Sequence, residues 1–328
     1  MMERVIRYLR NAIIGIVIAF LFLLSSTQTA SAHDGQPPAP HDLWSAWNWD
    51  PVIMLSLIIV AWIYVNGQRE LRRRAGVQRS NLSWRAASFI TGLITLFLAL
   101  VSPLDALSIA LFSAHMLQHM LLIAIVPPLL VLGVSPGSFL LAFTSPVRRI
   151  LGQWWHRMTL LQSAWHTLTQ PLVAWALNIL TLWVWHISRL YQTALENEAF
   201  HMLEHFCFVT TSLLFWWTVT RPSRGNPGIL ALFTMALQGG LLGALITFAP
   251  TPWYPVYALT TQSWGLSPLE DQQLAGAIMW IPAGIIYTVA ALMLFSNRLV
   301  SIERQANQRE RLMMKEREGI ASLGLREE

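Results

Sequence analysis

The sequence contains a single cysteine, Cys207, and few charged side chains. One cysteine cannot form an internal disulfide, and it cannot supply the several thiolates of a cysteine-based zinc site. Charged residues make up only 12% of the 328 residues, whereas hydrophobic residues make up 54%. Several apolar runs also reach the roughly 20 residues that a helix needs to cross a bilayer, so the chain belongs to the membrane class.

The apolar runs extend through the whole chain, which predicts one all-α, polytopic membrane helix bundle rather than two soluble domains. We expect about seven transmembrane helices after an N-terminal signal segment. The predicted spans are about 51–65, 84–101, 107–126, 171–187, 200–219, 228–249 and 274–295. Pro127-Pro128 interrupts the third span, and 129–143 is expected to be a kinked continuation, a re-entrant segment or an interfacial piece.

Four segments divide the chain. Residues 1–32 form a signal peptide or an N-terminal anchor, because three arginines precede an apolar run and an Ala30-Ser31-Ala32 cleavage site. Residues 33–50 are polar and Pro-rich and are expected to form an external arm. Residues 51–297 contain the predicted transmembrane bundle, and 298–328 a cytoplasmic charged tail.

The net charge of +5 and the sequence pI near 9.9 raise the question of nucleic-acid binding. The distribution of the charges favours a different explanation. With the mature N-terminus outside and the C-terminus in the cytoplasm, Arg189 is the only one of the 22 basic residues on the outside. This asymmetry is the positive-inside bias of a membrane protein, so we expect contact with the lipid bilayer and no nucleic-acid partner.

Two similar histidine motifs lie inside apolar runs. The first is His115-Met116-Leu117-Gln118-His119-Met120, and the second is His201-Met202-Leu203-Glu204-His205. On a helix, positions i, i+3 and i+4 share one face, so each motif forms a stripe of imidazole, amide or carboxylate, and imidazole. Ionisable groups inside a membrane helix are costly, which indicates a function for both stripes.

The predicted topology places both motifs in the outer half of the membrane. Because the third and fifth spans run in the same direction, their stripes can face each other. His115 is expected roughly 12 Å below the start of its helix, and His201 within the first turns of its own. We therefore predict His115, His119, His201 and His205 as metal ligands, with His186 at the end of the intervening span as a fifth.

Imidazole ligands with thioethers nearby suit copper or zinc, and the thioethers favour Cu(I). Met116, Met120 and Met202 lie beside the stripes and are candidates for metal transfer, although ordinary packing at helix interfaces is the commoner role for each of them. Gln118 and Glu204 are expected to orient the ligands or to offset metal charge. A mature N-terminal His33, with His41 nearby, would offer its α-amine and imidazole to copper; a mobile polar arm is the plainer interpretation.

Three other functions fit parts of the pattern. His201-x-x-Glu204-His205 matches the inverted signature of zinc metalloproteases, in which the glutamate activates water. One histidine from each motif also suits a bis-His haem. A copper permease would need polar groups that continue into the cytoplasmic half of the bundle, and the third and fifth spans lack them below the stripes.

Further residues give the chain a resemblance to a known family, the multi-spanning CtaG-type cytochrome c oxidase assembly factors. The similarity covers about 84–295. It includes the first motif with Pro127-Pro128-Leu129-Leu130, Trp185-His186 and Tyr191, the second motif with Phe215-Trp216-Trp217, and Asp271-Gln272-Gln273-Leu274-Ala275-Gly276 with Met279-Trp280.

The resemblance implies a non-enzymatic function in assembling a haem-copper oxidase of the respiratory chain, by helping copper reach its site. The implied partners are a haem-copper oxidase subunit and a periplasmic copper donor, and the implied location is the bacterial plasma membrane. Asp271 and Gln272 are expected to cover the site from the outer loop, or Asp271 is the N-cap of the following helix.

Overall fold

A computed structural model describes residues 38–75, 79–134, 137–220 and 227–324. All regular structure among these residues is helical, which confirms the predicted fold class. The predicted signal segment and His33 lie outside the described residues. From the N-terminal arm onward, the helices of the first half are η1 (Leu43–Ser45), α2 (Pro51–Ala75), α3 (Arg79–Val101), α4 (Pro103–Ala110), α5 (Phe112–Met120), η2 (Leu121–Ile125) and α6 (Val126–Gly133).

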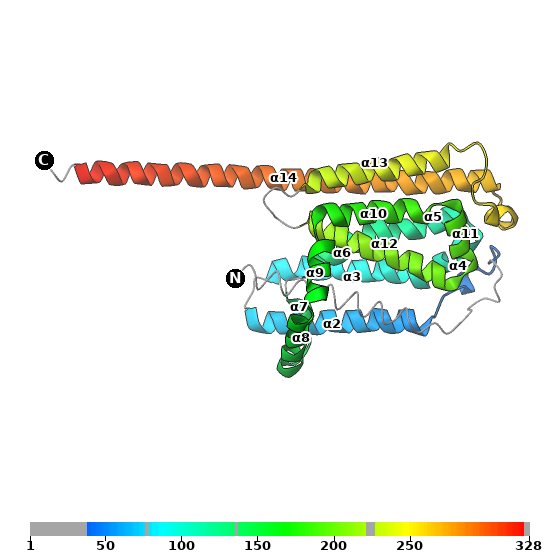
Figure 1. Cartoon of the computed structure of the whole chain (residues 1–328), viewed down its shortest axis with the longest axis horizontal. Helices are drawn as coiled ribbons and strands as arrows, with labels where there is room; N and C mark the ends of the chain where they lie inside the picture. The colour runs from blue at the N-terminus through cyan, green and yellow to red at the C-terminus, as the bar shows by residue number, and fades with distance from the viewer. Residues whose placement is uncertain (1–37, 76–78, 135–136, 221–226, 325–328) are drawn as a thin grey trace.

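The second half begins with short helices that cross one end of the bundle (Figure 1). Its elements are α7 (Ser138–Leu141), α8 (Ser145–Arg157), α9 (Thr159–Leu168), α10 (Pro171–Trp185), α11 (Ser188–Glu196), α12 (Glu198–Val219), α13 (Gly228–Thr247), η3 (Pro255–Leu259), η4 (Thr261–Trp264) and α14 (Pro268–Gly324). The last of these, α14, continues far beyond the bundle as a single helix, as Figure 1 shows. We call the opposite end, where α5, α12 and α14 begin, the histidine end.

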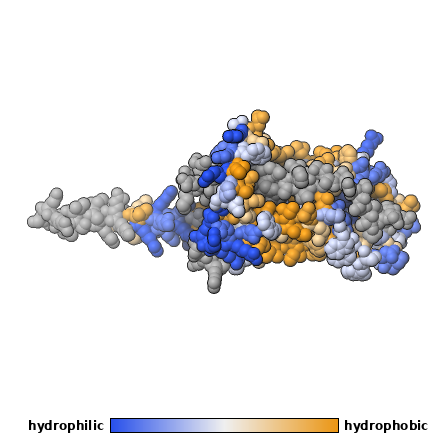
Figure 2. All heavy atoms as spheres, turned by 90° about the horizontal axis from the view of Figure 1, so that it is seen from below, coloured by the Kyte–Doolittle hydropathy of each residue, from blue (hydrophilic) through white to orange (hydrophobic). Residues whose placement is uncertain are grey.

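Five helices are long and apolar enough to cross a membrane, and the bent pair α9–α10 makes a sixth if it is one span. Figure 2 shows the corresponding apolar belt, with hydrophilic residues at both ends of the bundle. The chain is therefore a multi-pass membrane protein. The fifth predicted span, 200–219, corresponds to α12, which falls outside this set because its first turns contain His201, Glu204 and His205. It nevertheless packs within the bundle, against α10 and α6.

Two predicted boundaries are wrong. Residues 107–126 do not form one helix: α4 ends at Ala110, Leu111 is extended, and α5 begins at Phe112. His115 therefore lies in a first turn rather than well below one. The third span does not end at 126 either: Pro127 and Pro128 lie in the first turn of α6, so the segment after them continues the span, which was one of the predicted alternatives. The π-helical turn η2 precedes both prolines, and the span continues from Phe112 to Gly133.

The predicted outer loops also contain helices. Residues 188–199 include α11, whose Tyr191 and Ala194 are buried. In the loop predicted at 250–272, α14 already begins at Pro268, so Asp271 lies inside a helix. Its start has a capping box, since the Ser267 hydroxyl accepts from the Glu270 N–H and the Glu270 carboxylate accepts from the Ser267 N–H.

Close packing joins α13 and α14 through small residues. A methyl group at Gly276 would lie 2.7 Å from both the Gly243 carbonyl oxygen and the Thr247 nitrogen. Only glycine permits this approach, which is how membrane helices pack without a hydrophobic driving force between them. This contact with α13 holds the beginning of α14 in place at the histidine end.

We predict that Gly276→Ala lowers the stability of the purified protein by about 1–3 kcal/mol, because the added methyl group overpacks a rigid contact. Gly284→Ala is the matched control, since Gly284 lies in the same helix and its added methyl group meets nothing within 4 Å. Thermal unfolding in detergent measures both. Equal melting temperatures for the two variants would contradict the close α13–α14 contact.

Candidate metal centre

The two histidine motifs occupy the same register of their helices. His115 is the fourth residue of α5, and His201 is the fourth residue of α12. The rings pair in order: the centroids of His115 and His201 are 5.3 Å apart, and those of His119 and His205 are 5.4 Å apart. The two helices therefore run in the same direction with their stripes facing each other, as the sequence predicts.

The start of α5 is fixed by a residue from the far end of the sequence. The buried Asp271 carboxylate in α14 accepts hydrogen bonds from the Phe112 N–H at 2.7 Å and the Ser113 N–H at 3.1 Å, and it also accepts from the Ser113 hydroxyl. Negative charge at a helix N-terminus satisfies free N–H groups and is favoured by the helix dipole. Asp271 thus caps α5 and not its own helix, which corrects the predicted N-cap role.

Four candidate ligand atoms converge near the capped start of α5: the Nε2 atoms of His115 and His119 and the two carboxylate oxygens of Glu204. The Nε2 atoms of His115 and His119 are 2.8 Å apart. The Glu204 carboxylate lies opposite them, with one oxygen 3.9 Å from His115 Nε2 and the other 3.8 Å from His119 Nε2. Two groups of side chains could hold a metal ion: His115, His119 and Glu204, and His115, His201 and His205. We call these five residues the His–Glu centre.

Unsatisfied polar atoms show that the centre fits a metal ion. Within the described part of the chain, both oxygens of Glu204 and the Nε2 atoms of His201 and His205 have no hydrogen-bond partner. Each such buried group costs about 1–3 kcal/mol unless something satisfies it. Two nitrogens that bind one ion at roughly 2.0–2.1 Å lie about 2.8–3.4 Å apart, a range that includes the His115–His119 separation.

Hydrogen bonds around the centre orient His115. The Tyr257 hydroxyl donates to the Ser108 carbonyl at 3.1 Å, so it can accept from His115 Nδ1 at 3.4 Å. The Tyr191 hydroxyl lies 2.7 Å from the Tyr257 hydroxyl oxygen. A hydrogen on Nδ1 leaves the Nε2 lone pair of His115 directed at the centre, the usual arrangement behind a metal-binding imidazole. No local pattern predicts this contact of Tyr257 with His115, because it joins residues 142 positions apart in the sequence.

Glu204 and Gln118, which share one motif position, have different environments. The sequence predicts a supporting role for both. In the structure Glu204 lies among the atoms that could bind a metal ion, because α12 presents it to the two α5 histidines. The Gln118 amide turns away and donates to the Ala99 carbonyl and to Asp105, each at 2.8 Å. Gln118 therefore links α5 to its neighbours.

Asp105, in the first turn of α4, is a further acidic residue of this region, and it is not among the site residues that the sequence predicts. Its second oxygen accepts from Asn48 of the N-terminal arm at 2.8 Å, and its carboxylate interacts electrostatically with His201. Burial raises the pKa of Asp105 above its ordinary value. An acidic residue near the start of a histidine-bearing span was the available signal.

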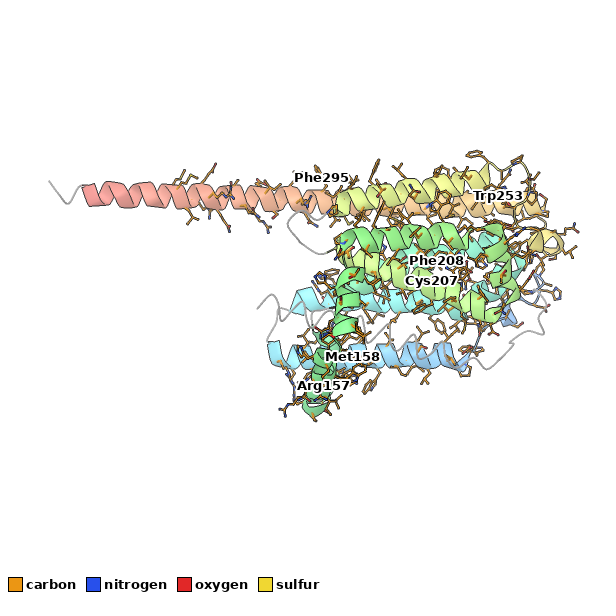
Figure 3. The ribbon with its side chains drawn as sticks, in the orientation of Figure 1. Arg157, Met158, Cys207, Phe208, Trp253 and Phe295 are labelled. Atoms are coloured by element: carbon orange, nitrogen blue, oxygen red, sulfur yellow. The ribbon has the colours of Figure 1, made fainter. Side chains whose placement is uncertain are left out.

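The remaining predicted residues lie beside the centre rather than in it. His186 belongs to neither ligand group, and its ring centroid is 6.2 Å from that of His119. Met116 and Met120 are buried and line an adjoining cavity, whereas Met202 is partly exposed and does not line it. Gln272 donates to the Ile246 carbonyl and accepts from the N–H of Trp253, which is labelled in Figure 3.

We predict that Asp271→Ala weakens metal binding and lowers stability by about 1–3 kcal/mol, because two buried N–H groups at the start of α5 lose their acceptor. Glu270→Ala is the control, since the neighbouring carboxylate caps α14 at the exposed surface. Metal titration and thermal unfolding distinguish the two variants. Unchanged metal affinity in Asp271→Ala would show that the cap does not position His115.

Similar proteins occur in mycobacteria. The chain is 28% identical over 257 residues to uncharacterized proteins of Mycobacterium bovis and Mycobacterium tuberculosis, covering 75% of this chain and 38% of each relative. A Mycobacterium leprae protein is 24% identical over 275 residues, covering 79% of this chain and 40% of the relative. The chain thus spans less than half the length of these relatives.

No solved structure matches the chain. The model of one family, described as the cytochrome c oxidase caa3 assembly factor, matches residues 62–300. This range covers most of the chain and includes every member of the His–Glu centre, in agreement with the resemblance seen in the sequence. The chain belongs to the cytochrome c oxidase caa3 assembly factor family.

Proposed function

We propose that this protein binds copper in the His–Glu centre and assists its delivery to a subunit of a haem-copper oxidase. The observation that carries the proposal is a buried cluster of imidazole and carboxylate atoms that lack protein partners, in a family described by oxidase assembly. The family's description names the assembly of an oxidase and names no catalysed reaction. That description is in keeping with a protein that binds and transfers a metal ion without catalysing a reaction.

The location of the centre supports delivery on the outer side of the plasma membrane. All five residues lie close to the starts of α5 and α12, at one end of the bundle. The positive-inside bias orients this histidine end outward. A periplasmic copper donor would then meet the protein at the Asp105–Asn48 contact and the η3–η4 loop, which surround the centre.

The donor set favours a divalent ion in the centre. Imidazole and carboxylate suit Cu(II) and Zn(II), whereas thioethers suit Cu(I). No methionine belongs to either ligand group among the described residues, so the Cu(I) preference inferred from the sequence does not apply to this centre. Copper remains the proposed cargo because a haem-copper oxidase requires it.

The geometry argues against the competing functions. A peptide substrate needs an open cleft, whereas His115 and Glu204 are 0% exposed and His119 is 2% exposed. A haem needs a pocket of several hundred cubic ångströms, and the cavity beside the histidines measures about 20 Å³. A compact ion fits both the closed site and the short distances between ligand atoms.

We predict that His115→Ala/His119→Ala abolishes Cu(II) retention by the purified protein, because one candidate ligand group loses two of its three members and the other loses one. His156→Ala/His166→Ala is the matched control, since both of those imidazoles are exposed and far along the chain from the motifs. Metal analysis and an optical spectrum measure the result.

In cells, the same ligand variant should yield an oxidase that keeps its haem and lacks copper, and added copper should partly restore it. Equal copper in the ligand and control variants would rule out the His–Glu centre as the site. A Soret band that depends on His115 and His119 would identify a haem protein instead.

A separate prediction concerns Glu204. Glu204→Gln keeps the shape of the side chain and removes the charge that offsets a divalent ion, so copper affinity should fall by about tenfold or more. A protease would respond differently, since it would keep its metal and lose peptide hydrolysis. Unchanged copper affinity in Glu204→Gln would show that the carboxylate is not a ligand.

A further inference from the structure

A small cavity lies directly beside the His–Glu centre, toward the middle of the bundle. It measures about 20 Å³, which is room for roughly one water molecule. Phe208, labelled in Figure 3, forms part of its wall. The side chains that matter chemically are Met116, Met120, Met235, Met279, His119 and His186.

Four of the chain's 12 methionines meet at this one cavity. They come from three helices, with two in α5 and one each in α13 and α14, and all four are at most 7% exposed. Methionine commonly fills irregular gaps in a core, so their burial alone indicates only packing. Thioethers are also the softest neutral ligands that a protein offers, and they select monovalent copper.

The two histidines supply an observation that packing does not explain. His186 Nδ1 lies 2.6 Å from the Leu182 carbonyl oxygen, which fixes the hydrogen on Nδ1 and leaves a lone pair on Nε2. This Nε2 atom is buried and has no hydrogen-bond partner among the described residues. His119 Nδ1 is in the same condition, although the other nitrogen of that ring faces His115.

We propose a second metal site in this cavity, for a soft monovalent ion such as Cu(I), with His186 and the methionine thioethers as ligands. The identity of the natural ion, copper, rests on the proposed function. The preference for a soft monovalent ion rests on the sulfur and imidazole donors alone. The site differs from the His–Glu centre in its donors, because sulfur replaces carboxylate. The second site also gives a role to Met116, Met120 and His186. The sequence analysis predicts these residues as part of a metal site, but none of them belongs to the His–Glu centre.

His119 lies between the two sites. A neutral imidazole has one lone pair, so this ring can serve the His–Glu centre through Nε2 or the methionine cavity through Nδ1, but not both at once. The remaining ligands of each site are separate: His115, His201, His205 and Glu204 on one side, and His186 with the methionines on the other. Two ions can therefore be bound together, with His119 assigned to one of them.

The test uses the purified full-length protein with Ag(I), a redox-inert probe for Cu(I) sites, in the presence of excess Zn(II) to fill the His–Glu centre. We expect one equivalent of Ag(I) that zinc does not displace, with sulfur neighbours in its X-ray absorption spectrum. Met116→Leu/Met279→Leu should weaken this Ag(I) binding at least tenfold while Zn(II) binding is retained. Methionine and leucine have similar volumes, so the exchange keeps the core packed.

Met293→Leu is the matched control, since Met293 lies on α14 with Met279 and is 62% exposed. The proposal is overturned if zinc displaces all the Ag(I), if the bound silver has no sulfur neighbours, or if the double variant binds Ag(I) as tightly as the control. Failure of the proposed function gives a different pattern. In that case neither Zn(II) nor Cu(II) binds, or Glu204→Gln leaves their affinity unchanged, while the Ag(I) site persists.

Discussion

Glu204 lies fully buried opposite the imidazoles of His115 and His119, and neither of its oxygens accepts a hydrogen bond from the described residues. Moving a carboxylate out of water without a partner is among the most costly changes a folded protein can accommodate. A bound cation removes that cost and satisfies the facing nitrogens together with the carboxylate. The placement of α5, α12 and α14 follows from this requirement, because each contributes either a ligand or the cap that positions one.

The surrounding structure makes the centre rigid. Asp271 fixes the first turn of α5, Asn197 accepts from the Phe200 N–H at the start of α12, and Tyr257 contacts both Ser108 and His115. Ligands held by independent contacts need little rearrangement to bind an ion, which raises affinity. The donors also change with depth, from carboxylate and imidazole near the helix starts to thioether farther inside. An ion that moved inward would thus meet progressively softer ligands.

The sequence was sufficient for the parts of the fold that depend on local pattern. Charge asymmetry and apolar runs predict the membrane bundle and the shared direction of α5 and α12. The H-M-L-x-H spacing likewise predicts that each pair of histidines lies on one helix face. The convergence of four histidines follows from these two facts alone, because a parallel pair of helices with the same motif brings like positions together.

Other features depend on contacts between distant residues and have no local signal. Leu111 continues an apolar helical pattern, yet it is extended because Asp271, 160 residues later, caps the following turn. Whether Glu204 is a ligand or a supporting residue depends on the rotation of α12 about its axis, which a motif does not specify. Gln118 occupies the equivalent position in α5 and turns toward Asp105 because α3 and α4 pack on that side. No motif brings His186 together with the buried methionines; that neighbourhood is visible only in the cavity that they line.

The cap on α5 also determines when the centre can form during biosynthesis. Membrane helices enter the bilayer in the order in which the ribosome makes them, and α14 is the last. Until Asp271 has been translated and its helix inserted, the turn that carries His115 lacks the carboxylate that fixes it. The candidate metal centre therefore acquires its fixed geometry only after α14 has been inserted, although all five of its side chains precede that helix.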